Sequence, residues 1–345
     1  MSESQSNPVS RQIASVHKKH EDAKGSWVTY RPDIKVLDCT VRDGGLMNDH
    51  HFDDAFVKRV YDTCVAAGVD YMEFGYKGMK SMFPPDKFGP WKRCAEEDLR
   101  RIVGDNPSDM KLCAMADAER TDYHKDILPK EDSVLDVIRV ATYIHQIPTA
   151  LEIIKDAHDK GYETTLNLMA ISVVQDRELA EAIEVIAASE IDTLYIVDSF
   201  GAFYSEQIRD LTALYLRALE GTGKEVGMHA HNNQMLAYSN TIESAILGVN
   251  RLDATIGGLG RGAGNCPLEL LLGFLKNPKF HLRPVLECAQ DLLVPLREKV
   301  DWGFSIPYML TGQLNTHPRP AMKMRAGENP DDYVGFYDQL TEEEG

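Results

Sequence analysis

The chain has 345 residues, of which 43% are hydrophobic, enough for a sizeable core and too many for a generally disordered protein. Its 54 acidic and 37 basic residues give a net charge of −17, which disfavours binding to nucleic acid or to a membrane surface. No apolar stretch approaches the roughly 18 residues of a membrane span. Six scattered cysteines without a C-x-x-C motif indicate reduced thiols in the cytoplasm.

Residues 1–30 are polar and charged, and we expect them to form a flexible N-terminal arm. Between residues 31 and 276, short apolar runs alternate with stretches of helical spacing. The predicted strands span Ile34–Thr40, Asp70–Tyr76, Lys111–Ala116, Val137–Thr142, Thr164–Ser172, Thr193–Asp198, Glu225–His231 and Arg251–Ile256. The predicted helices include Asp53–Gly68, Pro148–Lys160, Glu178–Ser189, Ser205–Leu219 and Met235–Leu247.

This alternation predicts an α/β fold, a (β/α)8 TIM barrel, over residues 31–276. An open doubly wound sheet is the alternative. It would need a phosphate-binding fingerprint after the first strand, and the segment 42–45, Arg-Asp-Gly-Gly, is not one. Residues 277–345 are expected to form a C-terminal helical extension on or near the top of the barrel, because Val285–Val300 has helical spacing and prolines interrupt the residues that follow.

His229 and His231 are two residues apart at the end of the seventh predicted strand. Alternate residues of a strand point to the same face, so the two imidazoles would lie side by side as potential metal ligands. Taken alone, the pair is equally compatible with strand histidines satisfied by hydrogen bonds, because the motif names no further ligand.

In a TIM barrel, polar residues at the C-terminal ends of the strands converge on one mouth. Here they are Arg42, Asp43, Glu73, Arg139, Asn167, Ser172, Asp198, Ser199, His229, His231 and Asn265. Asp43 supplies the carboxylate that the two histidines lack, and Asn265 adds an amide oxygen. Such a set without thiolates favours Mg²⁺ or Mn²⁺ over structural zinc.

The other mouth residues are candidates for substrate binding. Arg42, next to the metal carboxylate in sequence, can meet a substrate carboxylate or a developing enolate oxygen with a fork of donors. Further candidates are Arg139, Asn167, Ser172 and Asp198. Arg139 and Asp198 could equally be ion-pair partners inside the barrel. The glycine-rich segment Gly257–Gly264 is either a tight turn or an anion-binding loop that opens a helix.

Three separated motifs carry a resemblance to a known family. They are Leu37–Gly44 (L-D-C-T-V-R-D-G), the H-x-H-N of the seventh strand, and Gly257–Glu269. The chain resembles, over about residues 34–275, the DRE-type metal-dependent TIM-barrel family, which includes 3-hydroxy-3-methylglutaryl-CoA lyase, isopropylmalate and homocitrate synthases and 4-hydroxy-2-oxovalerate aldolases. Val137–Thr142 and Gly262–Glu269 are most similar to the aldolase branch.

The resemblance implies a site around Mn²⁺ or Mg²⁺. Asp43, His229 and His231 would be the ligands, with Asn265 binding directly or through water. Arg42 would stabilise a pyruvate enolate.

The resemblance is less complete for proton transfer. The aldolase branch carries a catalytic histidine in the loop after the metal aspartate, and Met47 takes its place here. Asn48, His50 or a water is expected to take over this role. Tyr308 or His317 of the C-terminal extension is expected to close the mouth.

We therefore predict a class II aldolase that cleaves a 4-hydroxy-2-oxo acid into pyruvate and an aldehyde, or forms it from them. One alternative is a Claisen-type acyltransferase that condenses acetyl-CoA with a 2-oxo acid, and another is a non-catalytic metal-binding barrel subunit. The predicted partners are a small-molecule 2-oxo acid and an aldehyde, and a second copy of the chain in a homodimer.

Overall fold

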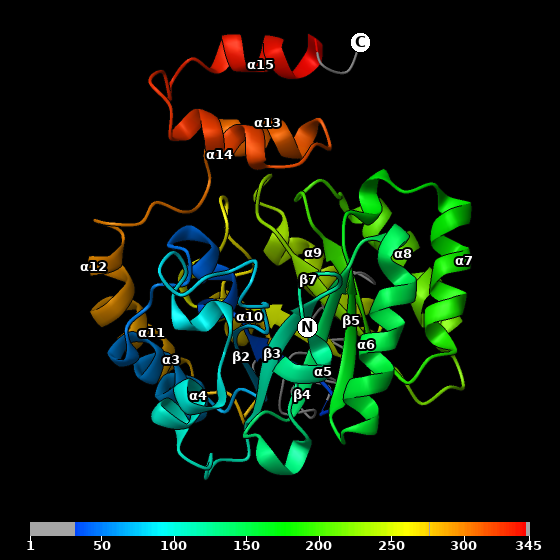
Figure 1. The fold of residues 1–345 in the computed structure, drawn as a ribbon. Helices are drawn as coiled ribbons and strands as arrows, with labels where there is room; N and C mark the ends of the chain where they lie inside the picture. The colour runs from blue at the N-terminus through cyan, green and yellow to red at the C-terminus, as the bar shows by residue number, and fades with distance from the viewer. Residues whose placement is uncertain (1–31, 276, 343–345) are drawn as a thin grey trace, which may run out of the picture.

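Eight parallel strands close into a barrel at the centre of the molecule (Figure 1). In the computed structural model, which describes residues 32–275 and 277–342, the strands are β1 (Lys35–Asp38), β2 (Tyr71–Tyr76), β3 (Lys111–Asp117), β4 (Val137–Thr142), β5 (Glu163–Leu168), β6 (Thr193–Asp198), β7 (Glu225–Ala230) and β8 (Arg251–Ala254). Strand β1 pairs with both β2 and β8. This closure confirms the TIM barrel and excludes the open sheet. The predicted arm, residues 1–30, lies outside the described residues.

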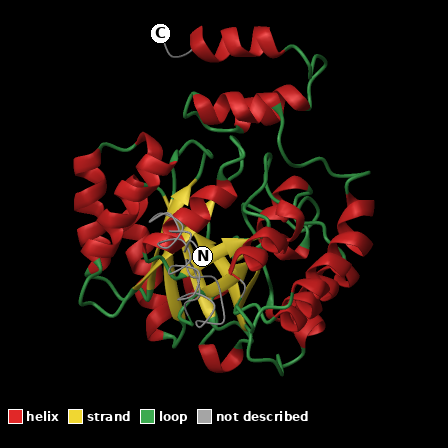
Figure 2. Cartoon of the chain, turned by 180° about the vertical axis from the view of Figure 1, so that it is seen from behind, coloured by secondary structure: helices red, strands yellow, loops and turns green. Residues whose placement is uncertain are grey.

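Helices follow the strands and cover the outside of the barrel, as the view from behind in Figure 2 also shows. They are α2 (Thr40–Gly44), α3 (Asp54–Ala67), α4 (Glu96–Val103), α5 (Tyr123–Asp126), α6 (Ile147–Asp159), α7 (Asp176–Ala187), α8 (Ser205–Ala218), α9 (Ala237–Leu247), α10 (Leu268–Leu275), α11 (Leu282–Cys288), α12 (Val294–Leu296), α13 (Ile306–Gln313), α14 (Arg319–Arg325) and α15 (Tyr333–Glu342). None of the helices in these described ranges combines the length and the apolarity needed to cross a bilayer.

Helix α3 shows how the local sequence sets these elements. The side chain of its N-cap residue, Asp53, accepts a hydrogen bond from the Phe56 backbone N–H at 2.8 Å. Its C-cap residue, Gly68, has a φ of 73°, a left-handed conformation that glycine adopts without strain. Val57 and Val60 are fully buried, so the helix packs its apolar face on the barrel.

The first strand is shorter than predicted. It ends at Asp38, and the next residues form the short helix α2 instead of continuing the strand into a loop. Arg42 and Asp43 therefore lie on one turn of helix at the mouth of the barrel.

The fifth strand also ends early. It was predicted to reach Ser172, but it ends at Leu168 because Ala170 has a φ of 54°, outside the range of any strand. Ser172 follows in a 3₁₀ turn, Ile171–Val173, so it does not lie at the strand end where the prediction had placed it.

The interior of the barrel contains a charged layer between two apolar ones. Toward the N-terminal ends of the strands the side chains of Leu37, Cys39, Tyr71, Cys113 and Val137 form an apolar cluster. Toward the mouth, Tyr76, Met115 and Ala141 form another. Between them, buried Arg139 donates to Glu73 at 2.9 Å and to Asp253 at 2.5 Å. The barrel therefore holds its own ion pairs in its centre.

The C-terminal residues divide into two parts. The predicted helix Val285–Val300 is replaced by α11, a π-helical turn and α12, which ends at Leu296. Pro295 has no N–H to donate, so the regular hydrogen bonding of one long helix is interrupted there. Because α11 packs against α3, this first part belongs to the outer layer of the barrel.

The last three helices, α13, α14 and α15, stand above the mouth of the barrel (Figure 1). A separate apolar cluster holds them together, formed by Ala263, Tyr308, Leu310, Ala321, Phe336 and Leu340. Ala263 belongs to the loop after β8, so this cluster also fastens the three helices to the barrel.

Candidate functional site

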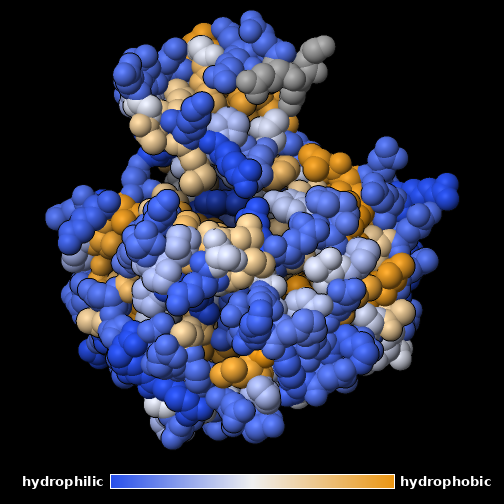
Figure 3. All heavy atoms as spheres, in the orientation of Figure 1, coloured by the Kyte–Doolittle hydropathy of each residue, from blue (hydrophilic) through white to orange (hydrophobic). Residues whose placement is uncertain are grey.

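A cavity of about 310 Å³ lies at the mouth of the barrel, under the C-terminal helices. Figure 3 shows the hollow between these helices and the barrel, with strongly hydrophilic residues inside it. Its walls come from the ends of several strands and from α14, so residues far apart in the sequence meet there. The volume suits a small organic acid.

The turn of helix α2 places two charged residues in this cavity. Arg42 donates to Asp43 Oδ1 at 2.6 Å through Nη1 and to Glu73 Oε2 at 2.7 Å through Nε. Burial alone would raise the pKa of Asp43, but the positive charge of Arg42 holds that pKa well below its usual range. Asp43 is therefore a carboxylate anion near neutral pH.

His229 and His231 present equivalent nitrogen atoms to the cavity. Nδ1 of His229 lies 3.0 Å from Asp253 Oδ2, and Nδ1 of His231 lies 3.1 Å from the Asp198 carbonyl oxygen. Since both partners can only accept, each Nδ1 carries the hydrogen and each Nε2 keeps a lone pair. Burial lowers the pKa of His231 to about 3, which keeps its imidazole neutral.

Asn265 is brought to the same place by the glycine loop, residues 257–264. Its Nδ2 donates to Asp43 Oδ2 at 2.7 Å, and it forms a β-bridge with His231. Gly260 makes this approach possible: a Cβ there would lie 2.3 Å from Asn265 Nδ2 and 2.5 Å from Asp43 Oδ2. The glycine loop is thus a close-approach turn that seats Asn265 beside the carboxylate.

Trp302 holds the glycine loop from outside. Its indole Nε1 donates to the Gly257 carbonyl oxygen at 3.1 Å, and the neighbouring Gly303 N–H donates to the Gly262 carbonyl oxygen at 3.0 Å. The indole is 3% exposed and stacks on the Arg297 guanidinium at 4.0 Å. Both ends of the loop are therefore anchored by one short segment.

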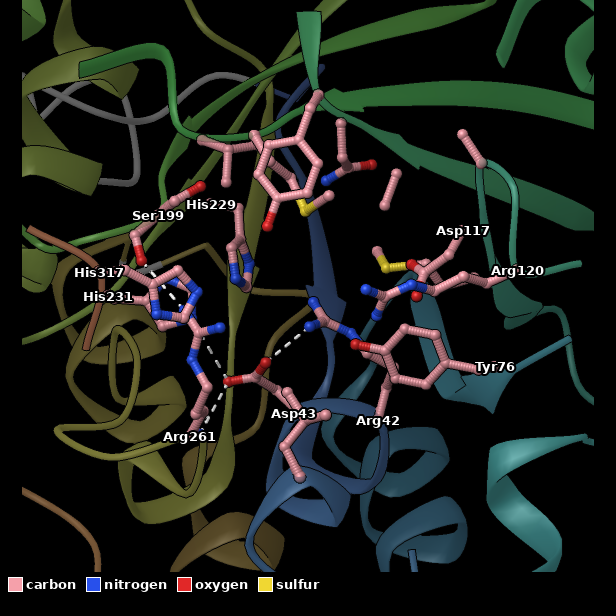
Figure 4. Close-up of a pocket in the computed structure, with 18 of the residues that line it drawn as sticks. Arg42, Asp43, Tyr76, Asp117, Arg120, Ser199, His229, His231, Arg261 and His317 are labelled. Carbon is pink, nitrogen blue, oxygen red and sulfur yellow. Dashed lines mark hydrogen bonds and ion pairs between the residues drawn. The ribbon is translucent and has the colours of Figure 1, made fainter. Parts of the chain in front are cut away.

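These residues fit a divalent metal ion. One ligand atom each from Asp43, His229 and His231 lies within 4.8 Å of the other two (Figure 4). Nε2 of His229 and Nε2 of His231 are buried without a hydrogen-bond partner among the described residues, and so is Oδ1 of Asn265, a fourth potential ligand atom. Buried polar atoms are seldom left unpaired unless something else binds them. The predicted ligand set thus comes together around one point.

A second group, Cys39, His229 and Asp253, also has ligand atoms within 4.8 Å of one another. It is a poorer metal site. Burial raises the pKa of the Cys39 thiol well above its usual value, and Asp253 is already bonded to Arg139 and His229. The role of Asp253 that the geometry supports is to orient His229.

Among the predicted substrate-binding residues, Arg42 and Asn167 line the cavity. Arg139 is the ion-pair partner of Glu73 and Asp253 inside the barrel. Asp198 accepts hydrogen bonds from the Ala202 and Phe203 backbone N–H groups and shapes the loop after β6. Ser172 lies in its turn, with its carbonyl oxygen bonded to Asn315. Arg139, Asp198 and Ser172 therefore lie outside the cavity lining.

Of the residues predicted to transfer a proton or to close the mouth, only one lines the cavity. His317 lines the cavity, whereas Tyr308 is buried against Gly262 of the glycine loop, where a Cβ would lie 2.8 Å from its Cε1. Asn48 and His50 follow α2 outside the lining. His50 stands perpendicular to Tyr76, with ring centroids 5.3 Å apart, and burial lowers the pKa of His50 to about 3.

The cavity also contains side chains that the prediction did not include: Tyr76, Lys92, Asp117, Arg120 and Arg261. Tyr76 and Asp117 stand at the C-terminal ends of β2 and β3, so the rule of strand ends would have found them. The predicted third strand ended one residue too early for Asp117. Lys92 and Arg120 lie on loops, where no periodicity marks them.

Comparisons with known proteins agree with this fold. Residues 33–287 match the family model described as HMGL-like. The chain is 32% identical over 262 residues to an oxaloacetate decarboxylase of Mycobacterium tuberculosis, covering 74% of each chain. It is 28% identical over 254 residues to 4-hydroxy-2-oxovalerate aldolase 3 of Rhodococcus jostii, covering 72% of this chain and 71% of the relative.

Among solved structures, the N-terminal domain of a protein described as a candidate aldolase from Bacteroides vulgatus superimposes with a TM-score of 0.74 at 29% identity. The match covers 84% of this chain and 95% of that one. The hydroxymethylglutaryl-CoA lyase of Pseudomonas aeruginosa, with a TM-score of 0.63 and 17% identity over 76% of this chain and 93% of its own, shares the fold. The match to the family model spans all eight strands and both motifs predicted to hold a metal, and the chain belongs to the HMGL-like family.

Proposed function

We propose that the chain is a divalent-metal-dependent carbon–carbon lyase that cleaves a 4-hydroxy-2-oxo acid into pyruvate and an aldehyde, and catalyses the reverse condensation. The observation that carries the proposal is the convergence of Asp43, His229, His231 and Asn265 beside Arg42 in a cavity sized for a small acid. Relatives named 4-hydroxy-2-oxovalerate aldolase support the choice of reaction.

The metal we propose is Mn²⁺ or Mg²⁺, because the donors are a carboxylate, an amide and two imidazoles without a thiolate. When bound, the ion supplies Lewis acidity to the 2-oxo group and stabilises the negative charge that develops there. Asp253 fixes the tautomer of His229, and the Asp198 carbonyl fixes that of His231.

Arg42 is the chain's own positive group at the reacting centre. Its Nε and Nη1 are bonded to Glu73 and Asp43, which hold the guanidinium rigid. The remaining terminal nitrogen is available to the carboxylate or to the enolate oxygen of the substrate. Held this way, the donor needs no reorganisation as charge develops during bond cleavage.

Aldol cleavage also requires a group that takes the proton from the 4-hydroxyl. We propose that His50 does so together with Tyr76, whose ring reaches the cavity. The lowered pKa keeps the His50 imidazole neutral, with Nδ1 unpaired and free to accept, but it also makes His50 a weak base that needs Tyr76 to share the proton. Asn48 and a water remain the other predictions for this step. For Tyr308 we propose a supporting role under the glycine loop.

The test is pyruvate release from 4-hydroxy-2-oxovalerate by the purified protein, with and without Mn²⁺ and after treatment with a chelator. Release that depends on Mn²⁺ supports the lyase. Release of CoA thiol from acetyl-CoA and a 2-oxo acid, without pyruvate release, would instead identify the acyltransferase. Metal retention without turnover of any substrate would identify a non-catalytic subunit.

A second candidate reaction is decarboxylation of oxaloacetate. It is favoured by the relative named oxaloacetate decarboxylase and by the place of His50 outside the cavity lining. Loss of CO₂ gives the same pyruvate enolate but needs no base for a hydroxyl proton. Comparing CO₂ release from oxaloacetate with pyruvate release from the hydroxy acid decides between the two.

We further propose a cytoplasmic location, consistent with six free and buried cysteines. The homodimer predicted from the sequence stays a prediction, and size-exclusion chromatography with light scattering would test it.

A further inference from the structure

Among the charged side chains that line the cavity, positive ones predominate, whereas the chain as a whole is negatively charged. Its lining carries five cationic side chains, Arg42, Lys92, Arg120, Arg261 and Arg319, but only two carboxylates, Asp43 and Asp117. The full chain has 54 acidic and 37 basic residues. A bound divalent ion would add further positive charge, so the cavity is built for a ligand that carries more than one negative charge.

Two of the five cationic side chains, Arg42 and Arg261, are already bonded to other groups of the protein beside the proposed metal-binding residues, where the 2-oxo group of the substrate would bind. Arg42 is bonded to Asp43 and Glu73. Arg261 donates through its backbone N–H to Asp43 and through its guanidinium to the Ser199 carbonyl oxygen at 3.1 Å. Lys92, Arg120 and Arg319 have neither an ion pair nor a side-chain hydrogen bond to the metal-ligand side of the cavity among residues 32–275 and 277–342, whereas the Arg261 guanidinium is held by the Ser199 carbonyl.

Lys92 is the most informative of these three. It is 5% exposed, and its Nζ lies 3.8 Å from the centroid of the Tyr76 ring and 4.3 Å from that of Phe83. Two aromatic faces thus hold an ammonium group that forms no ion pair within the described chain, and Asp117 is the carboxylate that acts on it most strongly. Burial lowers the pKa of Lys92, and Asp117 opposes this shift from a distance. An anion bound beside Lys92 would restore its charge balance.

The loop that carries Lys92 is held tightly. The Gly78 N–H donates to the Lys92 carbonyl oxygen at 3.0 Å, and a Cβ at Gly78 would lie 2.8 Å from that oxygen and 2.8 Å from the Phe83 ring. The Met79 N–H donates to the Arg120 carbonyl oxygen at 2.9 Å, which joins this loop to the one after β3. Lys92 and Arg120 therefore stand on two loops fixed to each other.

Arg120 and Arg261 lie at opposite sides of the cavity. In Figure 4, Arg120 and Asp117 lie with Tyr76 on one side, and Arg261, His231 and His317 lie on the other. Asp43 and Arg42 stand between them. A 2-oxo acid held at Arg42 and the metal ligands would extend its other end toward Tyr76 and Lys92.

We propose that Lys92 and Arg120 form a second anion subsite, and that the substrates are 2-oxo dicarboxylic acids whose distal carboxylate binds there. This inference rests on the proposed function, since it uses the same cavity and the same 2-oxo acid end. In an aldol cleavage the distal carboxylate would keep its charge and leave on the aldehyde. Lys92 and Arg120 are specificity-determining residues for this reaction.

The first experiment compares kcat/KM for 4-hydroxy-2-oxoglutarate and 4-hydroxy-2-oxovalerate in the Mn²⁺-loaded full chain. The two acids differ by a carboxylate in place of a methyl group. We expect the wild-type protein to prefer the diacid by about ten- to a hundredfold, and K92M and R120Q each to reduce that ratio at least about tenfold. The matched control is K80M, an exposed lysine of the same loop outside the cavity, which should leave the ratio unchanged.

Equal preference for the two acids in the wild-type protein, or variants that slow both acids in parallel, would overturn the subsite. Arg120 is exposed, so R120Q tests the proposal even where K92M fails to fold.

A binding measurement separates this proposal from the proposed function. By calorimetry with Mn²⁺-loaded protein, 2-oxoglutarate should bind about ten- to a hundredfold more tightly than 2-oxopentanoate, and R120Q should remove most of this difference. If neither hydroxy acid is cleaved but this difference is present, the lyase reaction is wrong and the subsite stands. Tighter binding of a phosphonate analogue of 2-oxoglutarate would overturn the assignment to a carboxylate.

Discussion

The two ends of the barrel use charge in opposite ways. At the N-terminal ends of the strands, Arg251 pairs with Glu163 at 2.6 Å and with Glu225, while Lys35 lies 2.9 Å from Glu225. Lys111 completes this ion-pair network at 2.6 Å from Glu163. At the mouth, in the described chain, potential ligand atoms of two histidines and an asparagine are left without hydrogen-bond partners, and Lys92 lies between two aromatic rings without an ion pair.

Paired charges at the N-terminal end of the barrel serve stability, whereas unpaired polar groups at the mouth serve ligand binding. Charges that satisfy one another, as those around Arg251 do, contribute to folding and leave nothing for a ligand. Buried polar atoms that lack partners reduce the stability of the folded chain, and binding a ligand recovers the loss. Four variants, from the largest expected effect to the smallest, test this contrast.

The largest effect is expected at the mouth, from D43N. It removes the carboxylate of the proposed metal site, and we expect pyruvate release to fall by about 10³-fold or more. It also leaves buried Arg42 with Glu73 as its remaining ion-pair partner, so the melting temperature should fall as well. The readouts are turnover, Mn²⁺ content and melting temperature. The matched control is D49N, the same substitution at an exposed position of the turn that follows α2. Mn²⁺ binding equal to that of the wild type in D43N would contradict the assigned site.

At the opposite end, R251M should affect stability and not chemistry. It leaves Glu163 and Glu225 without their shared cation, at a cost of about 2–3 kcal/mol in the free energy of unfolding, lessened by the 24% exposure of the Glu225 side chain. Urea denaturation measures this cost, and kcat at 25 °C should stay within about twofold. R177M, which breaks an exposed helical ion pair with Glu181, should cost less than about 0.5 kcal/mol.

D253N lies between the two ends, in the charged layer. His229 Nδ1–H loses its carboxylate acceptor, so the affinity for Mn²⁺ should fall about 10- to 100-fold while the first-sphere donors stay in place. Calorimetric titration with Mn²⁺ measures the loss, and activity should return at saturating metal. An affinity equal to that of the wild type would show that Asp253 serves only its ion pair with Arg139.

The smallest effect is expected from D38N, which tests a carboxyl group without a cation. Burial raises the pKa of Asp38 to about 7, above the ordinary value of 3.8 that it regains on unfolding, although Thr40 donates to it at 2.6 Å. The folded chain therefore binds more protons than the unfolded chain between about pH 4 and 7, and this group makes stability fall as the pH rises through that window.

In D38N this contribution is absent. We expect the melting temperature of D38N to decline less than that of the wild type between pH 5 and 7 and to be no lower at pH 8. Glu163 and Glu225 provide the contrast: burial would raise their pKa values, but Arg251 keeps both below the ordinary value. An unchanged pH profile in D38N would mean that Asp38 stays ionised in the folded chain.

The sequence was sufficient to predict the barrel and the meeting of Asp43, His229 and His231 at its mouth, because both follow periodic rules. Val137–Thr142 and Thr193–Asp198 were predicted with the bounds that the structure has, since buried parallel strands are continuous apolar runs. His229 and His231 stand at or next to the end of β7, and Asp43 lies on the short helix that follows β1. In a parallel barrel these positions all face the same mouth.

The rest of the cavity could not be predicted in this way. Lys92 and Arg120 lie on loops whose paths depend on contacts between the loops themselves. Ser172 was misplaced because one left-handed residue, Ala170, ends its strand early, and nothing in an alanine marks that conformation. Arg139 and Asp198 stand near strand ends, yet their side chains are used by the barrel and by a loop.

The anchoring of the glycine loop by Trp302 has an optical consequence. The indole is bonded to one end of a loop whose other end carries Asn265, and it is shielded from solvent. The chain has two other tryptophans, so the difference in emission between the wild type and W302F reports on the loop, and this difference should change when Mn²⁺ binds. The chain carries its own chromophore for following metal loading in real time, without a label.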